Sequence, residues 1–317
     1  DMESIAAAAT PKIQEFDAQG LSNLCWALGC SKVAHRSLYK EVGPMVVSRG
    51  CRSYSAQQVA NICWSYASVA LLHRPLFEDA ARFATLSPGD FRAEEISALV
   101  WSMAMLGLPS AGLVSSAKAL VGASAREAAN LAWAAAVMGE HHEDLLSEAA
   151  KLLEAEGEAA QDLHLGQWYL AYLAYAQEAK SSGGAAFSEP WLHRSRKAAT
   201  RRATTQRAGS SRLHSSVSEE VRRVCGPNEL VIDELLVEQC IAVDIALPKL
   251  RLVIEVDGPV HFACDVESEV LSLLGPSQLK RRLLSRLGWQ VLSVDWRDWD
   301  VLDRPGRRRL LEHLLQR

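Results

Sequence analysis

Apolar residues recur along the first half of the chain with the spacing of amphipathic helices, and the pattern itself repeats. Tryptophan stands at Trp26, Trp64, Trp101, Trp133 and Trp168, at intervals of 38, 37, 32 and 35 residues. A small residue follows each tryptophan by three positions. Repetition at this period indicates stacked helical hairpins, each covering the apolar face of its neighbour. We therefore predict an α-solenoid of about five degenerate repeats over residues 1–176, with the tryptophans in its core.

Two polar positions within the repeats leave alternatives open. Asparagine precedes the tryptophan by three residues at Asn23, Asn61 and Asn130. Because asparagine is unfavourable inside a helix, it either forms a hydrogen bond between helices or faces RNA. The pairs His35-Arg36 and His73-Arg74 begin the second helices of two repeats. Arg36 and Arg74 either contact phosphates or stand at a helix end in solvent.

The second half of the chain alternates between strand-like and helix-like patterns. Apolar runs predict strands at 230–237, 240–246, 252–256 and 289–294, and periodic segments predict helices at 218–224, 278–287 and 310–315. Gly288 is placed to end the second of these helices. Strands that bracket a helix favour a layered α/β domain over residues 215–317.

Residues 177–214 lose all periodicity, so we predict a flexible basic linker there. Ser181-Ser-Gly-Gly reads as a break, and the segment from 194 to 212 has no acidic residue. Its seven cations are Arg194, Arg196, Lys197, Arg201, Arg202, Arg207 and Arg212. Such a composition predicts disorder in isolation. The charges either solvate the linker or tether it to phosphates.

Composition narrows the class of protein. With 317 residues and 49% hydrophobic content, the chain can form two domains. Residues 1–176 carry 12 Lys and Arg against 19 Asp and Glu, whereas residues 177–317 carry 22 against 19. A surface that binds nucleic acid should be basic, and only the first two repeats and the second half of the chain meet this condition. None of the seven cysteines forms a C-x-x-C pair, which argues against a disulfide framework or a zinc site.

No uncharged apolar run is long enough to cross a membrane, so no membrane partner is expected. The chain begins at Asp1 rather than Met, and a targeting segment would therefore lie outside it.

Acidic side chains lie within two predicted strands that are adjacent in the sequence. Asp244 lies in the run 241–247, and Glu255 and Asp257 lie in the next, followed by Gly258-Pro259 and then His261. Carboxylates gathered at buried strands are costly unless they bind a cation or one another. This pattern is typical of nucleases that hold a divalent metal.

Three motifs of the second half are Val243-Asp-Ile-Ala-Leu-Pro, Ile254-Glu-Val-Asp-Gly-Pro-Val-His-Phe262 and Gln278-Leu-Lys-Arg-Arg-Leu-Leu-Ser-Arg-Leu-Gly-Trp289. Together with Trp296 and Trp299, they resemble the RAP domain, an RNA-associated module of organellar proteins. The resemblance covers roughly residues 215–316. It implies a fold similar to restriction-endonuclease-like nucleases. In that fold, Asp244, Glu255 and Asp257 would be the metal ligands, for Mg²⁺ or Mn²⁺ if the domain is catalytic.

The resemblance departs from an active nuclease at one position. Asp257 stands where such an enzyme carries a lysine, two residues after Glu255. Lys280 on the following helix could replace that lysine, and His261 could act as ligand or general base. The alternative for Glu255, Asp257 and His261 is a structural network in which the side chains neutralise one another.

Further residues could contact RNA. Lys280, Arg281, Arg282 and Arg286 cluster on the helix at 278–287, which is either a phosphate surface or an ordinary amphipathic helix. Trp296 and Trp299 either stack on bases or pack against the C-terminal helix.

The repeat motif Val59-Ala-Asn-Ile-Cys-Trp-Ser-Tyr-Ala resembles the octotricopeptide repeat and its relatives in FAST-kinase-like organellar proteins, which commonly end in a RAP domain. Together the two resemblances imply mitochondrial or plastid RNA processing, stability or translation. A metal-dependent endoribonuclease and a repeat scaffold within a ribonucleoprotein complex, with protein partners, remain the alternatives.

Overall fold

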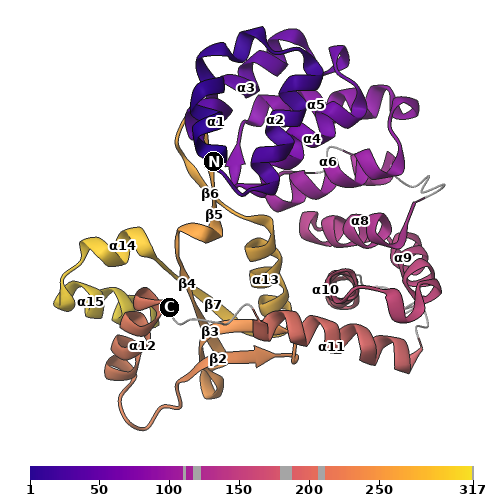
Figure 1. Cartoon of the computed structure of the whole chain (residues 1–317). Helices are drawn as coiled ribbons and strands as arrows, with labels where there is room; N and C mark the ends of the chain where they lie inside the picture. Colours follow the sequence, from indigo (N-terminus) through magenta and orange to yellow (C-terminus); the bar gives the residue numbers. More distant parts are fainter. Residues whose placement is uncertain (110–111, 117–122, 179–187, 206–210, 316–317) are drawn as a thin grey trace.

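The computed structural model describes residues 1–109, 112–116, 123–178, 188–205 and 211–315. A region of stacked helices is followed by a mixed α/β region, which confirms the predicted fold class (Figure 1). The predicted break at 181–184 and the cation Arg207 lie outside the described residues. None of the described helices combines the length and apolar character that a membrane crossing needs. All seven cysteines are free thiols.

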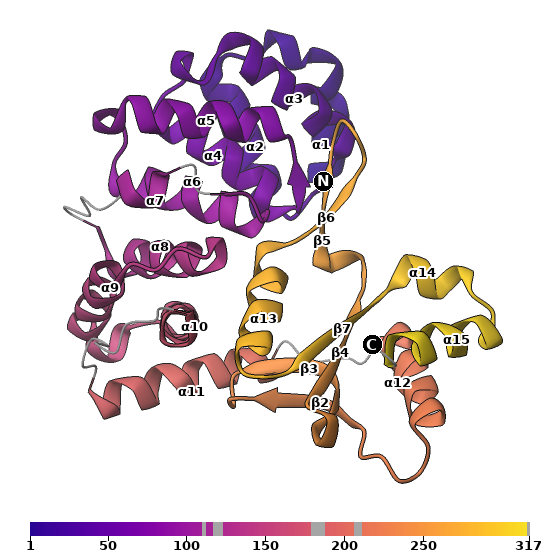
Figure 2. The ribbon, with the colours of Figure 1, turned by 180° about the vertical axis from the view of Figure 1, so that it is seen from behind.

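The helical region opens with α1 (Met2–Ala9) and the 3-10 turn η1 (Thr10–Glu15) and then forms two layers. The first helices of the repeats are α2 (Ala18–Cys30), α4 (Ala56–Ser68), α6 (Ala93–Met105), α8 (Ala125–Met138) and α10 (Asp162–Glu178). The second layer contains α3 (Arg36–Arg49), α5 (Arg74–Leu86), α7 (Leu113–Ser116) and α9 (Glu143–Ala155). Each first helix packs on the first helix of the next repeat (Figure 2). This is the arrangement that the repeat period predicts.

The repeated polar positions have identifiable local roles. The Nδ1 atoms of His35 and His73 accept hydrogen bonds of 3.2 Å from the backbone amides of Leu38 and Leu76, so both histidines cap a second helix. Asn61 donates to the Ser22 hydroxyl on the neighbouring first helix at 3.5 Å. The interhelical alternative for the asparagine position therefore holds in the second repeat.

The prediction that the repeat tryptophans lie in the core holds only toward the end of the stack. Trp168 is fully buried and Trp133 is 6% exposed, whereas Trp26 is 51% exposed and the prediction is wrong there. The difference follows the order of stacking. The ring of Trp64 lies against Gly29 of α2, but no described first helix lies before α2 to cover Trp26 in the same way.

The predicted linker is also partly wrong, because residues 189–205 form helix α11 (Glu189–Thr205). This helix packs on α10 as one more member of the first layer. Its buried residues, Trp191, Ser195, Ala198, Ala199 and Ala203, share one helical face. The i, i+4, i+7, i+8 spacing of these residues is visible in the sequence. The helix was not predicted because the many arginines between them suggested a solvated linker.

The C-terminal region is built on a four-stranded sheet. Its strands are β2 (Ile232–Val237), β3 (Ile241–Leu247), β4 (Leu252–Asp257) and β7 (Gln290–Asp295), in the order β2-β3-β4-β7. Only β4 and β7 are parallel, because a helix, α13 (Gly275–Arg286), connects them. The four predicted strands are confirmed within two residues.

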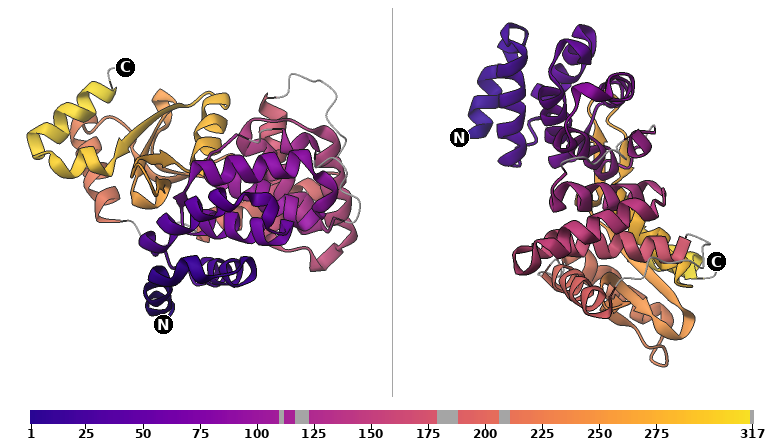
Figure 3. Two further views of the ribbon diagram at one scale, coloured as in Figure 1. Left: turned by 90° about the horizontal axis from the view of Figure 1, so that it is seen from above. Right: turned by 90° about the vertical axis from the view of Figure 1, so that its right-hand side faces the viewer.

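Helices cover both faces of this sheet. One face packs against α12 (Arg212–Cys225), α14 (Trp296–Val301) and α15 (Arg304–Leu315), which lie away from the helical array (Figure 3). The other face packs against α13, which stands between the sheet and the array. The core on the α13 side continues into the array, so the two regions share one hydrophobic interior.

A second, smaller sheet joins the two regions and was not predicted. The hairpin of β5 (Phe262–Asp265) and β6 (Leu271–Leu273) pairs in parallel with β1 (Leu71–Leu72), which lies between α4 and α5. The backbone amides of Cys264 and Val266 donate to the carbonyls of Ala70 and Leu72 at 2.9 and 2.8 Å. The pairing joins residues about 190 positions apart in the sequence, which local patterns do not indicate.

Arg282 of α13 forms polar contacts between the two regions. Its guanidinium donates to the carbonyls of Ala136 and Val137 at the end of α8, and to Glu178 Oε1 at 2.6 Å. His141 Nε2 lies 3.0 Å from the other oxygen of Glu178. One arginine therefore satisfies a helix C-terminus and a carboxylate whose side chain is only 5% exposed.

We predict that Arg282→Ala lowers the free energy of unfolding by about 3–5 kcal/mol, because it leaves a buried carboxylate without its main partner. Urea denaturation of the full chain measures this change. Arg286→Ala is the matched control, since Arg286 lies one turn further along α13 and is exposed. We expect the control to change stability by no more than about 0.5 kcal/mol. Equal stabilities of the two variants would contradict the role given to Arg282.

Candidate nucleic-acid interface

The predicted carboxylates of β4 lie on the sheet face that α13 covers. Leu252, Ile254 and Val256 point to the core under α12 and α15. Alternation along the strand places Glu255 and Asp257 on the opposite face, where they are 3% and 2% exposed. The strand therefore carries two acidic side chains into the interior.

Each of these carboxylates is paired with a cation from α13. Lys280 Nζ donates to Glu255 Oε2. The Arg281 guanidinium donates to Asp257 Oδ2, which also accepts from the Ser293 hydroxyl of β7. Removal of one member of a buried pair costs about 3–5 kcal/mol, since it leaves an uncompensated charge. The pairs thus fix the position of α13 on the sheet.

Asp244 and His261 lie beside these pairs but have other partners. Asp244 Oδ2 accepts from the backbone amide of Val256 at 2.7 Å, at the point where the ladder between β3 and β4 ends. His261 Nδ1 lies 3.3 Å from the Ser277 hydroxyl, and burial lowers the pKa of the His261 imidazole. Asp244 therefore completes the backbone hydrogen bonding of the sheet.

Burial dominates the electrostatics of Glu255. Desolvation raises the pKa of its carboxyl group to about 7, against the opposing effect of Lys280, and the nearby Asp244 and Asp257 raise it further. Glu255 Oε1 is buried and has no hydrogen-bond partner among the described residues. A neutral carboxylic acid is the form that such a site favours below pH 7.

The arrangement does not fit the divalent metal that the sequence suggested. A metal would need oxygens of Asp244, Glu255 and Asp257 to converge on one point. Instead, Lys280 and Arg281 contact Glu255 and Asp257, and Asp244 accepts from the backbone. Over the described ranges, no three His, Cys, Asp or Glu side chains are grouped so that they could hold a metal ion. The network alternative matches this geometry.

Cations predicted to face RNA are distributed over several contacts. On α13, Lys280, Arg281 and Arg282 are paired as described above, and Arg286 is exposed. Arg36 donates to the Cys264 thiol and so links α3 to β5. Four of the predicted cations, Arg36, Lys280, Arg281 and Arg282, therefore make contacts within the protein.

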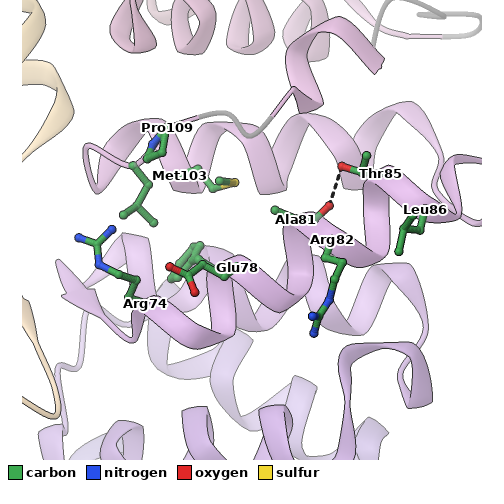
Figure 4. Close-up of a pocket in the computed structure, with 10 residues that line it drawn as sticks. Arg74, Glu78, Ala81, Arg82, Thr85, Leu86, Met103 and Pro109 are labelled. Carbon is green, nitrogen blue, oxygen red and sulfur yellow. Dashed lines mark hydrogen bonds between the residues drawn. The ribbon is translucent and has the colours of Figure 1, made fainter.

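Arg74 lies at one end of a cavity between α5 and α6. The cavity has a volume of about 530 Å³, and Figure 4 shows Arg74 at one end and Leu86 at the other. Apolar side chains from both helices, including Phe77 and Met103, line much of it. It is separate from the carboxylates of β4, so the structure does not bring Arg74 to the predicted catalytic residues.

The cations of α11 are largely engaged with the helical array. Arg194 donates to the Gly157 carbonyl at 2.7 Å, and Arg201 pairs with Asp162 at 2.7 Å. Burial lowers the pKa of the Arg202 guanidinium. Arg196 lies beside His193, and Lys197 is exposed. The segment thus anchors the end of the stack.

A basic surface lies on α12 and α15, and Arg212 is the one of its arginines that the sequence analysis considered, as part of the linker. The two helices pack on each other and together carry seven arginines against three glutamates. The arginines are Arg212, Arg222, Arg223, Arg304, Arg307, Arg308 and Arg309. The run Arg304-Pro-Gly-Arg-Arg-Arg309 was the available signal. We call this the α12–α15 surface.

The Trp299 side chain packs beneath the α12–α15 surface, on the side of the sheet. Trp299 is 1% exposed and donates from Nε1 to the Ser216 hydroxyl of α12 at 3.1 Å. Arg307 lies over its ring, 5.2 Å from the centroid. Trp299 therefore packs the C-terminal helix, and the base-stacking alternative is wrong for it. The neighbouring α14 adds Arg297 and two exposed carboxylates, Asp298 and Asp300.

Comparison with known proteins bears on this region. Residues 254–316 match the family model of the RAP domain. The chain carries a RAP domain. The matched range begins within β4, contains α13, β7, α14 and α15, and includes both paired cations.

A relative of part of the chain is also found. It is a chloroplastic RAP domain-containing protein of Oryza sativa subsp. japonica, 29% identical over 106 residues. The match covers 33% of this chain and 16% of the relative. The RAP domain is associated with organellar RNA binding and processing.

We predict that the free energy of unfolding of Glu255→Gln, relative to that of the wild type, increases as pH rises. The pKa of Glu255 is raised from 4.5 to about 7 on folding, so its contribution to stability is fully present below pH 4.5 and lost as pH rises through about 7. The difference between the two free energies of unfolding should therefore shift by about 3 kcal/mol between about pH 4 and pH 8.

Urea denaturation at a series of pH values measures this difference, with Glu269→Gln as a control at an exposed carboxylate. A difference between wild type and Glu255→Gln that does not change with pH would contradict the assigned burial of Glu255.

Proposed function

We propose that this protein is an organellar RNA-binding protein whose RAP domain contacts phosphates through the α12–α15 surface. The observation that carries the proposal is the position of this basic surface. It lies on the sheet face that points away from the helical array (Figure 3), while Lys280, Arg281 and Arg282 of α13 are engaged in ion pairs. Phosphate contacts from exposed arginines supply affinity without reading sequence.

The surface has the properties that backbone binding requires. Arg304 is 70% exposed and its nearest carboxylate oxygen, on Glu220, is 3.8 Å away. Arg309 is exposed on the same helix, and Arg308 pairs with Glu312 of that helix. Surface pairs of this kind contribute about 0–1 kcal/mol, so a phosphate can displace them.

The rice relative and the helical stack support the biological role that we propose. The named rice relative is chloroplastic, and the octotricopeptide-like stack suggested by the sequence would add a second RNA-binding element. We therefore propose a role in processing, stability or translation of plastid or mitochondrial RNA, within a ribonucleoprotein complex. The isolated RAP domain would supply general affinity for RNA, and the array or its partners would supply selectivity.

We do not propose the endoribonuclease alternative, because the geometry of Asp244, Glu255 and Asp257 offers it no support. The same preparation can test this choice. Labelled single-stranded and structured RNA incubated with EDTA, Mg²⁺ or Mn²⁺ should be retarded in a gel but remain intact. Metal-dependent cleavage that Glu255→Ala abolishes would contradict the proposal and restore the nuclease alternative.

We predict that Arg304→Ala/Arg309→Ala weakens binding of single-stranded RNA and lowers its salt dependence. Loss of two phosphate contacts should reduce the slope of log K against log salt concentration by about 1.4. Fluorescence anisotropy across a salt series measures both effects.

The matched control is Lys197→Ala/Arg286→Ala, which removes two exposed cations from α11 and α13. It should leave the slope unchanged. An equal loss of affinity in both double variants, or a loss in the control alone, would contradict the α12–α15 surface as the RNA-binding site.

A further inference from the structure

The cavity between α5 and α6 has the size and the lining of a ligand site. Its volume of about 530 Å³ lies within the range of about 300–1,000 Å³ that small-ligand sites occupy. Its walls are mostly apolar and include Phe77 and Ala81 of α5, Met103 of α6, and Leu108 and Pro109 just after α6. Such walls favour a ligand with a flat or apolar body.

Two charged side chains, Arg74 and Glu78, lie at one end of this cavity. They are four residues apart on α5 and therefore share one side of the helix, as Figure 4 shows. Both are exposed, and neither has a hydrogen bond or an ion pair within the part of the chain that the structure describes. By contrast, Arg82 of the same cavity pairs with Asp79. A cation and a hydrogen-bond acceptor are thus available to a ligand at this end.

The chemistry of these two groups specifies a ligand with a phosphate and a ring edge that carries N–H groups. The Arg74 guanidinium suits a phosphate, whereas the ionised Glu78 carboxylate only accepts hydrogen bonds. Guanine presents two neighbouring donors, N1–H and N2–H, on its Watson–Crick edge, which match the two carboxylate oxygens. Uracil presents one N–H between two carbonyl oxygens, which a carboxylate repels. A guanine nucleotide therefore fits this end of the cavity best.

The charge of the surrounding repeats favours RNA as the source of that nucleotide. Residues 20–93, which include α5, carry 8 Lys and Arg against 4 Asp and Glu, whereas residues 94–176 carry 3 against 11. The cavity thus belongs to the part of the array that attracts a phosphate backbone. Bases of single-stranded RNA can turn out of the strand and offer their Watson–Crick edges to a protein, which bases in a duplex cannot.

We propose that this cavity binds a guanine base of single-stranded RNA. The base lies between α5 and α6, its N1–H and N2–H groups donate to Glu78, and a flanking phosphate contacts Arg74. The inference rests on the proposed function, because the same RNA is held by the α12–α15 surface. That surface lies away from α5 and α6 (Figure 1), so it supplies general affinity while the cavity selects among bases.

Binding of four short labelled RNAs to the full chain tests the proposal. Each is a run of uridines with G, A, C or U at its centre, and fluorescence anisotropy at one salt concentration measures the affinity. The RNA with guanine should bind at least about fivefold more tightly than the RNA of uridine alone. Glu78→Gln should remove this preference, because the amide replaces one acceptor with a donor. Arg74→Ala should weaken binding of all four RNAs and keep their order.

Two further variants serve as controls. Glu41→Gln removes the same charge from an exposed position on α3, in the preceding repeat, and should keep the guanine preference. Ala81→Leu fills the cavity from α5 and should abolish the preference. Urea denaturation shows whether Ala81→Leu is folded, and the exposed position of Glu78 keeps the test independent of that result.

The outcomes separate this inference from the proposed function. Equal affinity of the wild type for the four RNAs would overturn the guanine site, as would a preference that survives Glu78→Gln. Glu78-dependent binding of free GMP without a guanine preference in RNA would also overturn it, because the cavity would then hold a soluble nucleotide. The proposed function is judged separately, by the loss of affinity for all four RNAs in Arg304→Ala/Arg309→Ala. Absence of binding to any RNA would overturn both.

Discussion

The position of helix α13 depends on three consecutive cations, and the arrangement of the whole molecule depends on α13. Lys280 and Arg281 neutralise the two carboxylates that β4 carries into the interior. Arg282, one residue further around the helix, contacts α8 and Glu178 of the array. Gly275, at the start of α13, approaches the Ala104 carbonyl so closely that no larger residue would fit. A single helix thus joins the sheet to the helical stack.

This connection has consequences for function. Because Glu255 and Asp257 are paired with Lys280 and Arg281, the two carboxylates help to hold α13 on the sheet. α13 faces the array, whereas α12 and α15, with their seven arginines, lie on the opposite face of the sheet. The pairing of β5 with β1 adds a second connection between the RAP domain and the array.

The parts predicted from sequence are those set by local periodicity. The tryptophan period gave the helical stack, and the apolar runs gave all four strands of the larger sheet. Glu255 and Asp257 were recognised from the sequence as a buried acidic pair. The sequence alone does not show whether a metal ion or a pair of cationic side chains balances their charge. Only the placement of Lys280 and Arg281 distinguishes them.

The β1–β5 pairing and the contact of Arg282 join distant parts of the chain and leave no periodic signal. Helix α11 was visible in its alanine stripe but was hidden by charge.

The RAP domain and the helical array are joined into one body, and hydrogen exchange of the backbone amides at their junction tests this arrangement. The amides of Cys264 and Val266 donate across the junction to Ala70 and Leu72. If the two regions are joined, these two amides exchange as slowly as the amides of β4 in the interior of the sheet. Exchange as fast as that of exposed loop amides such as Ser268 would show that the regions separate in solution, and would contradict the account.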